Sequence, residues 1–254
     1  MSAAHEKAVV AQFGPRARAY VESAVHAQGA DLDALDSILE KLKPQHALDL
    51  GAGGGHVAYL MAPHARAVTA YDLSSEMLAA VAATARERGL ENLRTAQGAA
   101  ERMPFEDGAF DCVVSRYSAH HWRDFEAGLR EARRVAKPGA RAVFIDAFSP
   151  AQSLFDTHLQ AIELLRDTSH GRDYSMAEWI AALGRAKFAI AGLRTFRLHL
   201  DFDSWIARMR TPEDNVRAIR ALQKAAAAET RAHFAIEEDG SFMLDVMLAE
   251  TTAE

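Results

Sequence analysis

The sequence predicts an α/β protein built on a doubly wound parallel sheet. Two observations lead to this prediction. Short apolar strands alternate with amphipathic helices between residues 45 and 150, and the first strand runs directly into a loop with glycines at positions 51, 53, 54 and 55. Repeated β-then-α units imply parallel strands joined by right-handed crossovers. Ligands of such sheets bind at the carboxyl ends of the strands, so we expect the chemistry in the loops that follow them.

The central segment, residues 44–150, is the expected ligand-binding core. Ser74 and Asp124 are suited to cap the helices that follow them, and Gly89 and Pro138-Gly139 are suited to end those helices. The apolar segments between these signals predict strands at 47–50, 67–73, 93–97, 110–116 and 141–148.

Two flanking segments are expected to complete one structural domain. Residues 1–43 predict helices that form an N-terminal lid, and Asp31 or Asp33 is a candidate cap for the second of them. Residues 151–254 predict an inserted helical lobe over the site and two further strands, which bring the sheet to seven strands. The expected helices of this segment are 151–166, 176–186 and 212–234, and the expected strands are 188–200 and 241–250.

Composition limits the class of protein. A chain of 254 residues suits one large domain, and a net charge of -6 without a long basic run argues against a nucleic-acid partner. The single cysteine, Cys112, excludes an intrachain disulfide. No segment approaches the roughly 18 apolar residues of a membrane helix, and the N-terminal residues lack an apolar signal core. We therefore expect a cytoplasmic protein without a membrane span, and we make no prediction of its oligomeric state.

The glycine loop, ALDLGAGGGH at 47–56, carries the strongest functional signal. Glycine lets the backbone turn sharply and approach a ligand closely, and the next helix begins there with free N–H groups. The dinucleotide pattern G-x-G-x-x-G requires a glycine where His56 stands, and the phosphate-binding P-loop pattern is absent. Asp49 instead suits the ammonium of S-adenosylmethionine, and Asp72 at the end of the second strand suits its ribose hydroxyls.

Four segments together resemble the successive motifs of class I S-adenosylmethionine-dependent methyltransferases. They are ALDLGAGGGH, VTAYDLSSEML, QGAAERMPFEDGAFDCVVSRYSAHHW and ARRVAKPGARAVFIDAFSP. The resemblance is to the subgroup similar to ubiquinone/menaquinone-biosynthesis C-methyltransferases, with the type 11 methyltransferase domain, and it covers residues 45–150 strongly. The rest resembles uncharacterised bacterial members of that subgroup. The resemblance implies a Rossmann-like sheet, S-adenosylmethionine as methyl donor and S-adenosylhomocysteine as product.

The resemblance also implies which residues bind the cofactor. The methionine end is expected at Asp49, Gly51, Ala52 and Gly53, with Ser115 beneath it. The ribose is expected at Asp72, and the adenine is expected at Leu73, Met77, Ala100 and Glu101. Tyr20 is the lid residue expected to cover the sulfonium, where an aromatic face would contribute about 0.5–2 kcal/mol. The family often has an aspartate where Ala99 stands, so the adenine amino group must find another partner here.

Methyl transfer from this cofactor requires few catalytic groups from the protein. Methyl transfer from a sulfonium is an in-line displacement that depends on alignment, and a base is needed only if the acceptor loses a proton. The base candidate is the pair His120-His121 after the fourth strand, of which His120 is chosen, and Asp146 at the end of the fifth strand is the second catalytic candidate. Arg116 is a candidate to bind the cofactor carboxylate or an anionic acceptor. No metal site is expected.

These observations predict a methyltransferase that acts on a small molecule, apolar or aromatic. Two alternatives stay open at this stage: a regulatory protein that binds S-adenosylmethionine without transferring its methyl group, and a nucleic-acid or protein methyltransferase. The sequence SRYS at 115–118 stands where many amino-methylating DNA enzymes have Asn/Asp-Pro-Pro-aromatic. A dinucleotide-dependent oxidoreductase is the least favoured alternative, because His56 stands where the dinucleotide pattern requires a glycine.

Overall fold

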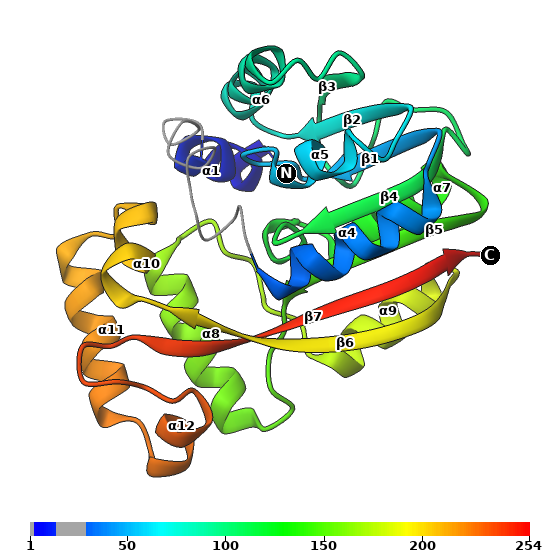
Figure 1. Ribbon diagram of the computed structural model, residues 1–254. Coiled ribbons are helices and arrows are strands. Elements are labelled where there is room, and N and C mark those ends of the chain that lie inside the picture. Colours follow the sequence, from blue (N-terminus) through cyan, green and yellow to red (C-terminus); the bar gives the residue numbers. More distant parts are fainter. Residues whose placement is uncertain (1–2, 14–28) are drawn as a thin grey trace.

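A seven-stranded sheet forms the centre of the molecule, in the order β3-β2-β1-β4-β5-β7-β6 (Figure 1). The computed structural model describes residues 3–13 and 29–254. The first five strands are parallel, and β7 runs antiparallel between β5 and β6. The doubly wound sheet is confirmed. The strands are β1 (His46–Leu50), β2 (Ala67–Asp72), β3 (Leu93–Gln97), β4 (Phe110–Arg116), β5 (Ala136–Ala147), β6 (Phe188–Leu200) and β7 (Phe242–Ala253).

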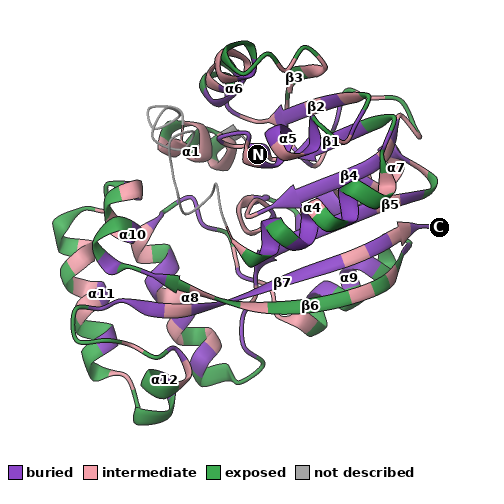
Figure 2. Ribbon diagram, in the orientation of Figure 1, coloured by how far each residue is buried: buried purple, intermediate pink, exposed green. Residues whose placement is uncertain are grey.

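Helices cover both faces of the sheet, and the inner strands are mostly buried, whereas the edge strands β3 and β6 are mostly exposed or half-buried (Figure 2). One face packs against α4 (Ala30–Leu42), α5 (His56–Met61) and α6 (Ser75–Glu87). The other packs against α7 (Phe125–Val135) and α9 (Met176–Arg185). Strand residues alternate between the two hydrophobic clusters because successive side chains point to opposite faces.

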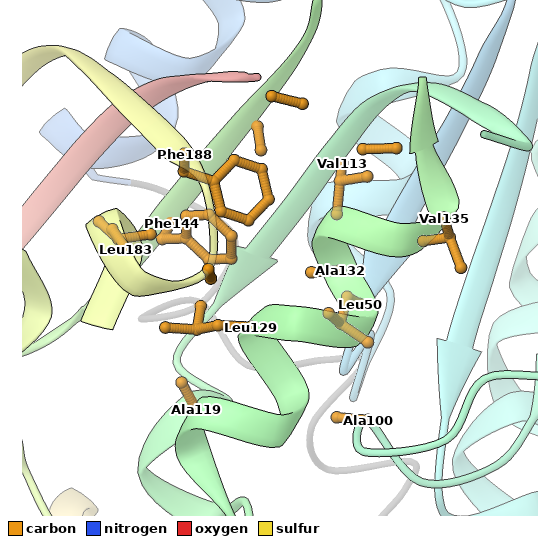
Figure 3. Packing of buried hydrophobic residues seen from close by; sticks show 14 of the residues in the cluster. Leu50, Ala100, Val113, Ala119, Leu129, Ala132, Val135, Phe144, Leu183 and Phe188 are labelled. Carbon is orange, nitrogen blue, oxygen red and sulfur yellow. The ribbon is translucent and has the colours of Figure 1, made fainter. Parts of the chain in front are cut away.

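The cluster beneath α7 and α9 shows how tightly the sheet is held (Figure 3). Leu50, Val113 and Phe144 come from three adjacent parallel strands and meet Leu129 of α7 and Leu183 of α9, all of them fully buried. Burial of each such side chain contributes about 1.5–3 kcal/mol relative to exposure. The strand ends that carry the polar residues described below therefore project from a rigid platform.

Four further helices form a separate lobe with its own core. The lobe contains α8 (Ser153–Arg166), α10 (Phe202–Met209), α11 (Glu213–Ala225) and α12 (Ala228–His233), which gather beside one end of β6 and β7 (Figure 1). Trp205, Phe234 and Phe242 are buried at its centre. Trp205 thus packs in the lobe core, and Trp179 packs in the core of the sheet.

Most of the helix caps and helix ends that the sequence predicts are confirmed. The Ser74 side chain accepts the N–H of Met77 at the start of α6, and Asp124 accepts that of Ala127 at the start of α7. Gly89 follows α6 with φ of 68°. The prediction for Pro138-Gly139 was wrong: α7 ends at Val135 and β5 begins at Ala136, which pairs with Phe110 beyond a β-bulge. Strand pairing overrides the local stop signal there.

Three other expectations need correction. Neither Asp31 nor Asp33 caps α4, because Gly29 occupies the N-cap and both aspartates lie in the first turn. The single helix expected at 212–234 is divided into α11 and α12 by an extended backbone at Ala226. The helix α10 was not predicted, although Asp201 caps it by accepting the N–H of Ser204.

Two structural findings bear on the compositional predictions. In residues 3–13 and 29–254, no helix is long and apolar enough to cross a membrane. Cys112 is fully buried in β4, and burial raises the pKa of its thiol to about 12. The thiol is therefore part of the core and unreactive.

Candidate active site

A cavity lies at the carboxyl ends of β1, β2 and β4. Its walls are the glycine loop after β1, the end of β2, the segment after β3, the turn after β4, and α1 (Ala3–Phe13). Every cofactor residue predicted from the first three of these segments lines it, so the structure brings together Asp49, Gly51, Ala52, Gly53, Asp72, Leu73, Met77, Ala100 and Glu101.

The glycine loop follows a path that other residues resist. Gly51 has φ of 77°, and a Cβ there would lie 1.8 Å from the Ser118 hydroxyl, so the loop packs directly on the turn after β4. Gly53 has φ of 49°, but a Cβ there would meet nothing within 4 Å. Its N–H donates to Oδ2 of Asp72 at 2.8 Å. The loop is thus held against β2 with open space above Gly53.

Two carboxylates border this space. Asp49 is buried, and its Oδ2 accepts the N–H of Ala58 at 2.9 Å. Burial raises the pKa of Asp49 to about 7. The second is Asp72, whose Oδ1 accepts the N–H of Ser74 at 2.9 Å, and burial raises its pKa as well. Buried carboxylates favour a cationic neighbour, which restores the charged form.

The turn after β4, the 3₁₀ helix η2 (Ala119–His121), carries the two adjacent histidines. Nδ1 of His120 lies 2.6 Å from Oδ1 of Asp146, whose Oδ2 accepts the N–H of Ala119 at 2.9 Å. Burial opposes a charge on His120, but the carboxylate of Asp146 outweighs it and raises the pKa to about 9. His120 and Asp146 therefore form an ion pair that fixes the turn.

Three predicted site residues stand apart from the cavity lining. His120 and Asp146 lie behind it, and Ser115 is buried in β4, where its hydroxyl makes no hydrogen bond within residues 3–13 and 29–254. Their assigned roles stay predictions. Of the two adjacent histidines, His121 does line the cavity, as His5 and His56 also do. Sequence reasoning named His121 only together with His120 and chose His120 of the pair, because two adjacent residues in a short turn carry no periodicity that says which one faces the ligand.

Helix α1 forms a further wall of the cavity, and its role as a lid stays a prediction. It contributes His5, Glu6, Val9 and Phe13 to the cavity. Nε2 of His5 lies 2.9 Å from the carbonyl oxygen of His121, and the Phe13 ring meets the His121 ring edge-on at 5.0 Å. The predicted lid residue Tyr20 lies outside the described residues.

Arg116, at the end of β4, has a buried partner. Its Nε lies 2.6 Å from Oδ2 of Asp31 in α4, and its guanidinium lies 4.7 Å from the centre of the Tyr117 ring. It also lines the cavity. A guanidinium held this way presents a fixed positive charge beside Asp49.

Comparison with known proteins agrees with this architecture. Residues 48–144 match the family described as Methyltransferase domain. The chain is 47% identical over 200 residues to the Escherichia coli protein YafE, which covers 79% of this chain and 97% of YafE. It is 34% identical over 224 residues to YcgJ of Bacillus subtilis, named an uncharacterized methyltransferase, with 88% of each chain covered. The chain therefore belongs to the class I S-adenosylmethionine-dependent methyltransferases.

Two further comparisons refine the placement within that class. The crystal structure of YcgJ superposes with a TM-score of 0.84 at 32% identity, over 88% of this chain and 98% of YcgJ. The chain is also 39% identical over 134 residues to a demethylmenaquinone methyltransferase of Thermus thermophilus, a match that spans 50% of this chain and 60% of that enzyme. The resemblance to the quinone-biosynthesis subgroup is thus confined to part of the chain.

Proposed function

We propose that this protein transfers the methyl group of S-adenosylmethionine to a small molecule that is apolar or aromatic. The observation that carries the proposal is the composition of the single cavity described above. Carboxylates and glycines line it together with an apolar set that includes Val9, Phe13, Tyr117 and Trp122. A polar cofactor suits the carboxylates and glycines, and an apolar acceptor suits the apolar set.

The residues at the glycine loop fit S-adenosylmethionine. The open space above Gly53 leaves room for a ligand where any larger side chain would stand. Asp49 suits the ammonium of the amino-acid portion, and Arg116 beside it suits the carboxylate. Asp72 retains lone pairs for ribose hydroxyls while both of its oxygens accept backbone N–H groups. Leu73, Met77, Ala100 and Glu101 would then border the adenine.

The cofactor supplies an already activated methyl group, so the protein's contribution is alignment and shielding. Gly51 and Ser118 pack together and fix the loop that would hold the methionine end. Trp122 donates from Nε1 to the Ser118 hydroxyl at 3.0 Å, which fixes the acceptor wall to the same point. Helix α1 closes the cavity and excludes water. Alignment of this kind is the main source of acceleration in a displacement between two bound molecules.

Support for a small acceptor comes from charge and from one relative. The net charge of -6 disfavours binding to nucleic acid. The name of the Thermus thermophilus relative specifies a small molecule, demethylmenaquinone, as its acceptor.

The test is to incubate the protein with S-adenosylmethionine labelled at the methyl group and a desalted cell extract, and then to separate small molecules from macromolecules. We expect the label in an organic-soluble small molecule, and no transfer with Asp72→Ala. Label in RNA, DNA or protein would replace the proposed acceptor class with a macromolecule. Binding of S-adenosylhomocysteine without transfer to any fraction would favour the regulatory alternative.

A further inference from the structure

We propose that His121 accepts, through Nε2, a hydrogen bond from a hydroxyl or amino group on the methyl acceptor and takes its proton during transfer. This inference rests on the proposed function and narrows the acceptor to molecules whose reacting group carries a proton. His121 lines the cavity one short turn beyond Ser118, which packs against Gly51. It therefore stands beside the part of the wall assigned to the methionine end of the cofactor.

The hydrogen bonds of His121 determine its tautomer. Nδ1 lies 3.2 Å from the carbonyl oxygen of Ser169. A carbonyl oxygen can only accept, so Nδ1 carries the proton and Nε2 keeps the lone pair. The nearest polar atom given for Nε2 is Oδ2 of Asp167 at 3.9 Å, which is too far for a hydrogen bond. Among the described residues, Nε2 therefore has no hydrogen-bond donor to satisfy it.

Burial and the neighbouring His120 keep His121 uncharged. Their ring centroids are 4.2 Å apart, and His120 is already charged through its pairing with Asp146. Burial first, and then the positive charge of His120, lower the pKa of His121 to about 3. His120 itself cannot take the role, because its Nδ1 is committed to Asp146 and its side chain lies behind the cavity wall.

Charged and titratable groups lie near His121 on several elements. They are His5 of α1, His120 of η2, Asp146 of β5, and Asp167 and His170 after α8. Glu6 and Arg123 also line the cavity, where they pair with each other at 3.4 Å. Among these groups, the Asp167 carboxylate is placed to interact with a protonated His121. Its Oδ1 accepts from the N–H and hydroxyl of Ser169, while its buried Oδ2 has no partner among the described residues. An imidazolium at His121 would place a positive charge 3.9 Å from that oxygen.

The transfer step then balances. The acceptor's nucleophilic atom forms a bond to the methyl carbon as the bond from that carbon to sulfur breaks, and the sulfur keeps the electron pair. The acceptor's proton passes to Nε2 of His121. The positive charge that leaves the sulfur therefore appears on the imidazole, 3.9 Å from the Asp167 carboxylate.

A nuclear magnetic resonance experiment tests this without knowledge of the natural acceptor. Protein labelled with ¹⁵N-histidine is saturated with S-adenosylhomocysteine at pH 7.5, and phenol or anisole is added as a probe. These probes have similar rings, but only phenol has a hydroxyl donor. We expect a proton on Nδ1 of His121, none on Nε2, and a shift of the Nε2 resonance with phenol alone. His121→Phe should remove the response to phenol, and His199→Phe, at an exposed histidine, should retain it.

A proton on Nε2 in the complex would overturn the inference, whatever the probes do. Equal responses to phenol and anisole, including none to either, would also overturn it. These results concern His121 alone and leave the proposed function standing if S-adenosylhomocysteine binds. Failure of S-adenosylhomocysteine to bind would instead contradict the proposed function, and the assignment of His121 would fall with it.

Discussion

Nδ1 of His120 lies 2.6 Å from Oδ1 of Asp146, so an ion pair joins the turn after β4 to the end of β5. The same carboxylate accepts the N–H groups of Ala119 and Ala147 at 2.9 Å. One side chain therefore organises both segments behind the cavity. The adjacent main chain is held from the other side, because the His120 carbonyl oxygen accepts the N–H of Gly171 at 2.8 Å.

This pair makes stability depend on pH. The pKa of His120 is about 9 in the folded protein and about 6.5 when unfolded, so its stabilising contribution is complete below pH 6.5 and is lost as the pH rises through 9. Since 16% of the side chain is exposed, we expect a loss of about 2 kcal/mol between pH 6 and 9.5. Urea unfolding should show this loss in the wild type and a smaller one in Asp146→Asn. Parallel pH profiles for the two proteins would contradict the ion pair.

The buried ion pair of Asp31 and Arg116 should contribute more to the free energy of unfolding than the exposed Asp33 does. Asp31→Asn removes the charge that compensates a buried guanidinium, and we expect a loss of roughly 3 kcal/mol in the free energy of unfolding. Asp33→Asn is the matched control, because Asp33 lies in the same first turn of α4 but is exposed. A difference under about 0.5 kcal/mol between the two variants would show that the pair does not stabilise the fold.

A substitution at Gly53 should weaken cofactor binding much more than it weakens the stability of the fold. Gly53→Ala places a methyl group in open space at φ of 49°, so it should cost only about 1 kcal/mol of stability and yet occupy room for the cofactor. We expect S-adenosylhomocysteine to bind at least tenfold more weakly. Gly139→Ala also lies at a positive φ, 80°, with free space around it, but Gly139 does not line the cavity, so this variant should leave affinity unchanged. Equal affinities for both variants would place the cofactor elsewhere.

Gly128 determines the position of Trp122 in the cavity wall. A Cβ at Gly128 in α7 would lie 2.3 Å from the indole ring, so Gly128→Ala should push Trp122 out of place and cost about 1–3 kcal/mol. Gly184→Ala in α9 has nothing within 4 Å and should stabilise the protein slightly through helix propensity. The free energies of unfolding of the two variants check this, and opposite signs are the expected result.

Much of the fold could be predicted because its signals are local. The bounds of β4 and β6 follow from runs of apolar and β-branched residues, and the side chains of Ser74 and Asp124 cap their helices within three residues. The start of β5 could not be predicted in this way, because its pairing with β4 extends over Pro138.

The site was predictable only where a motif spans it. The glycine loop and the ends of β1 and β2 carry such a motif, and the structure gathers those residues at one cavity. The pairing of Asp31 with Arg116 joins residues 85 positions apart, and the contact between His121 and Ser169 joins residues 48 positions apart. No local pattern encodes either contact. The contribution of His5 to the wall likewise depends on where α1 docks.

The most direct test of the central claim is isothermal titration of the purified protein with S-adenosylhomocysteine, beside Asp72→Ala and the control Asp33→Asn. Loss of a charged hydrogen-bond acceptor for the ribose should weaken binding by roughly tenfold to a hundredfold, or about 1.5–3 kcal/mol. We predict micromolar binding to the wild type and to Asp33→Asn, and a marked loss in Asp72→Ala. No binding to the wild type, or equal binding to all three proteins, would contradict the assignment of this cavity to the cofactor.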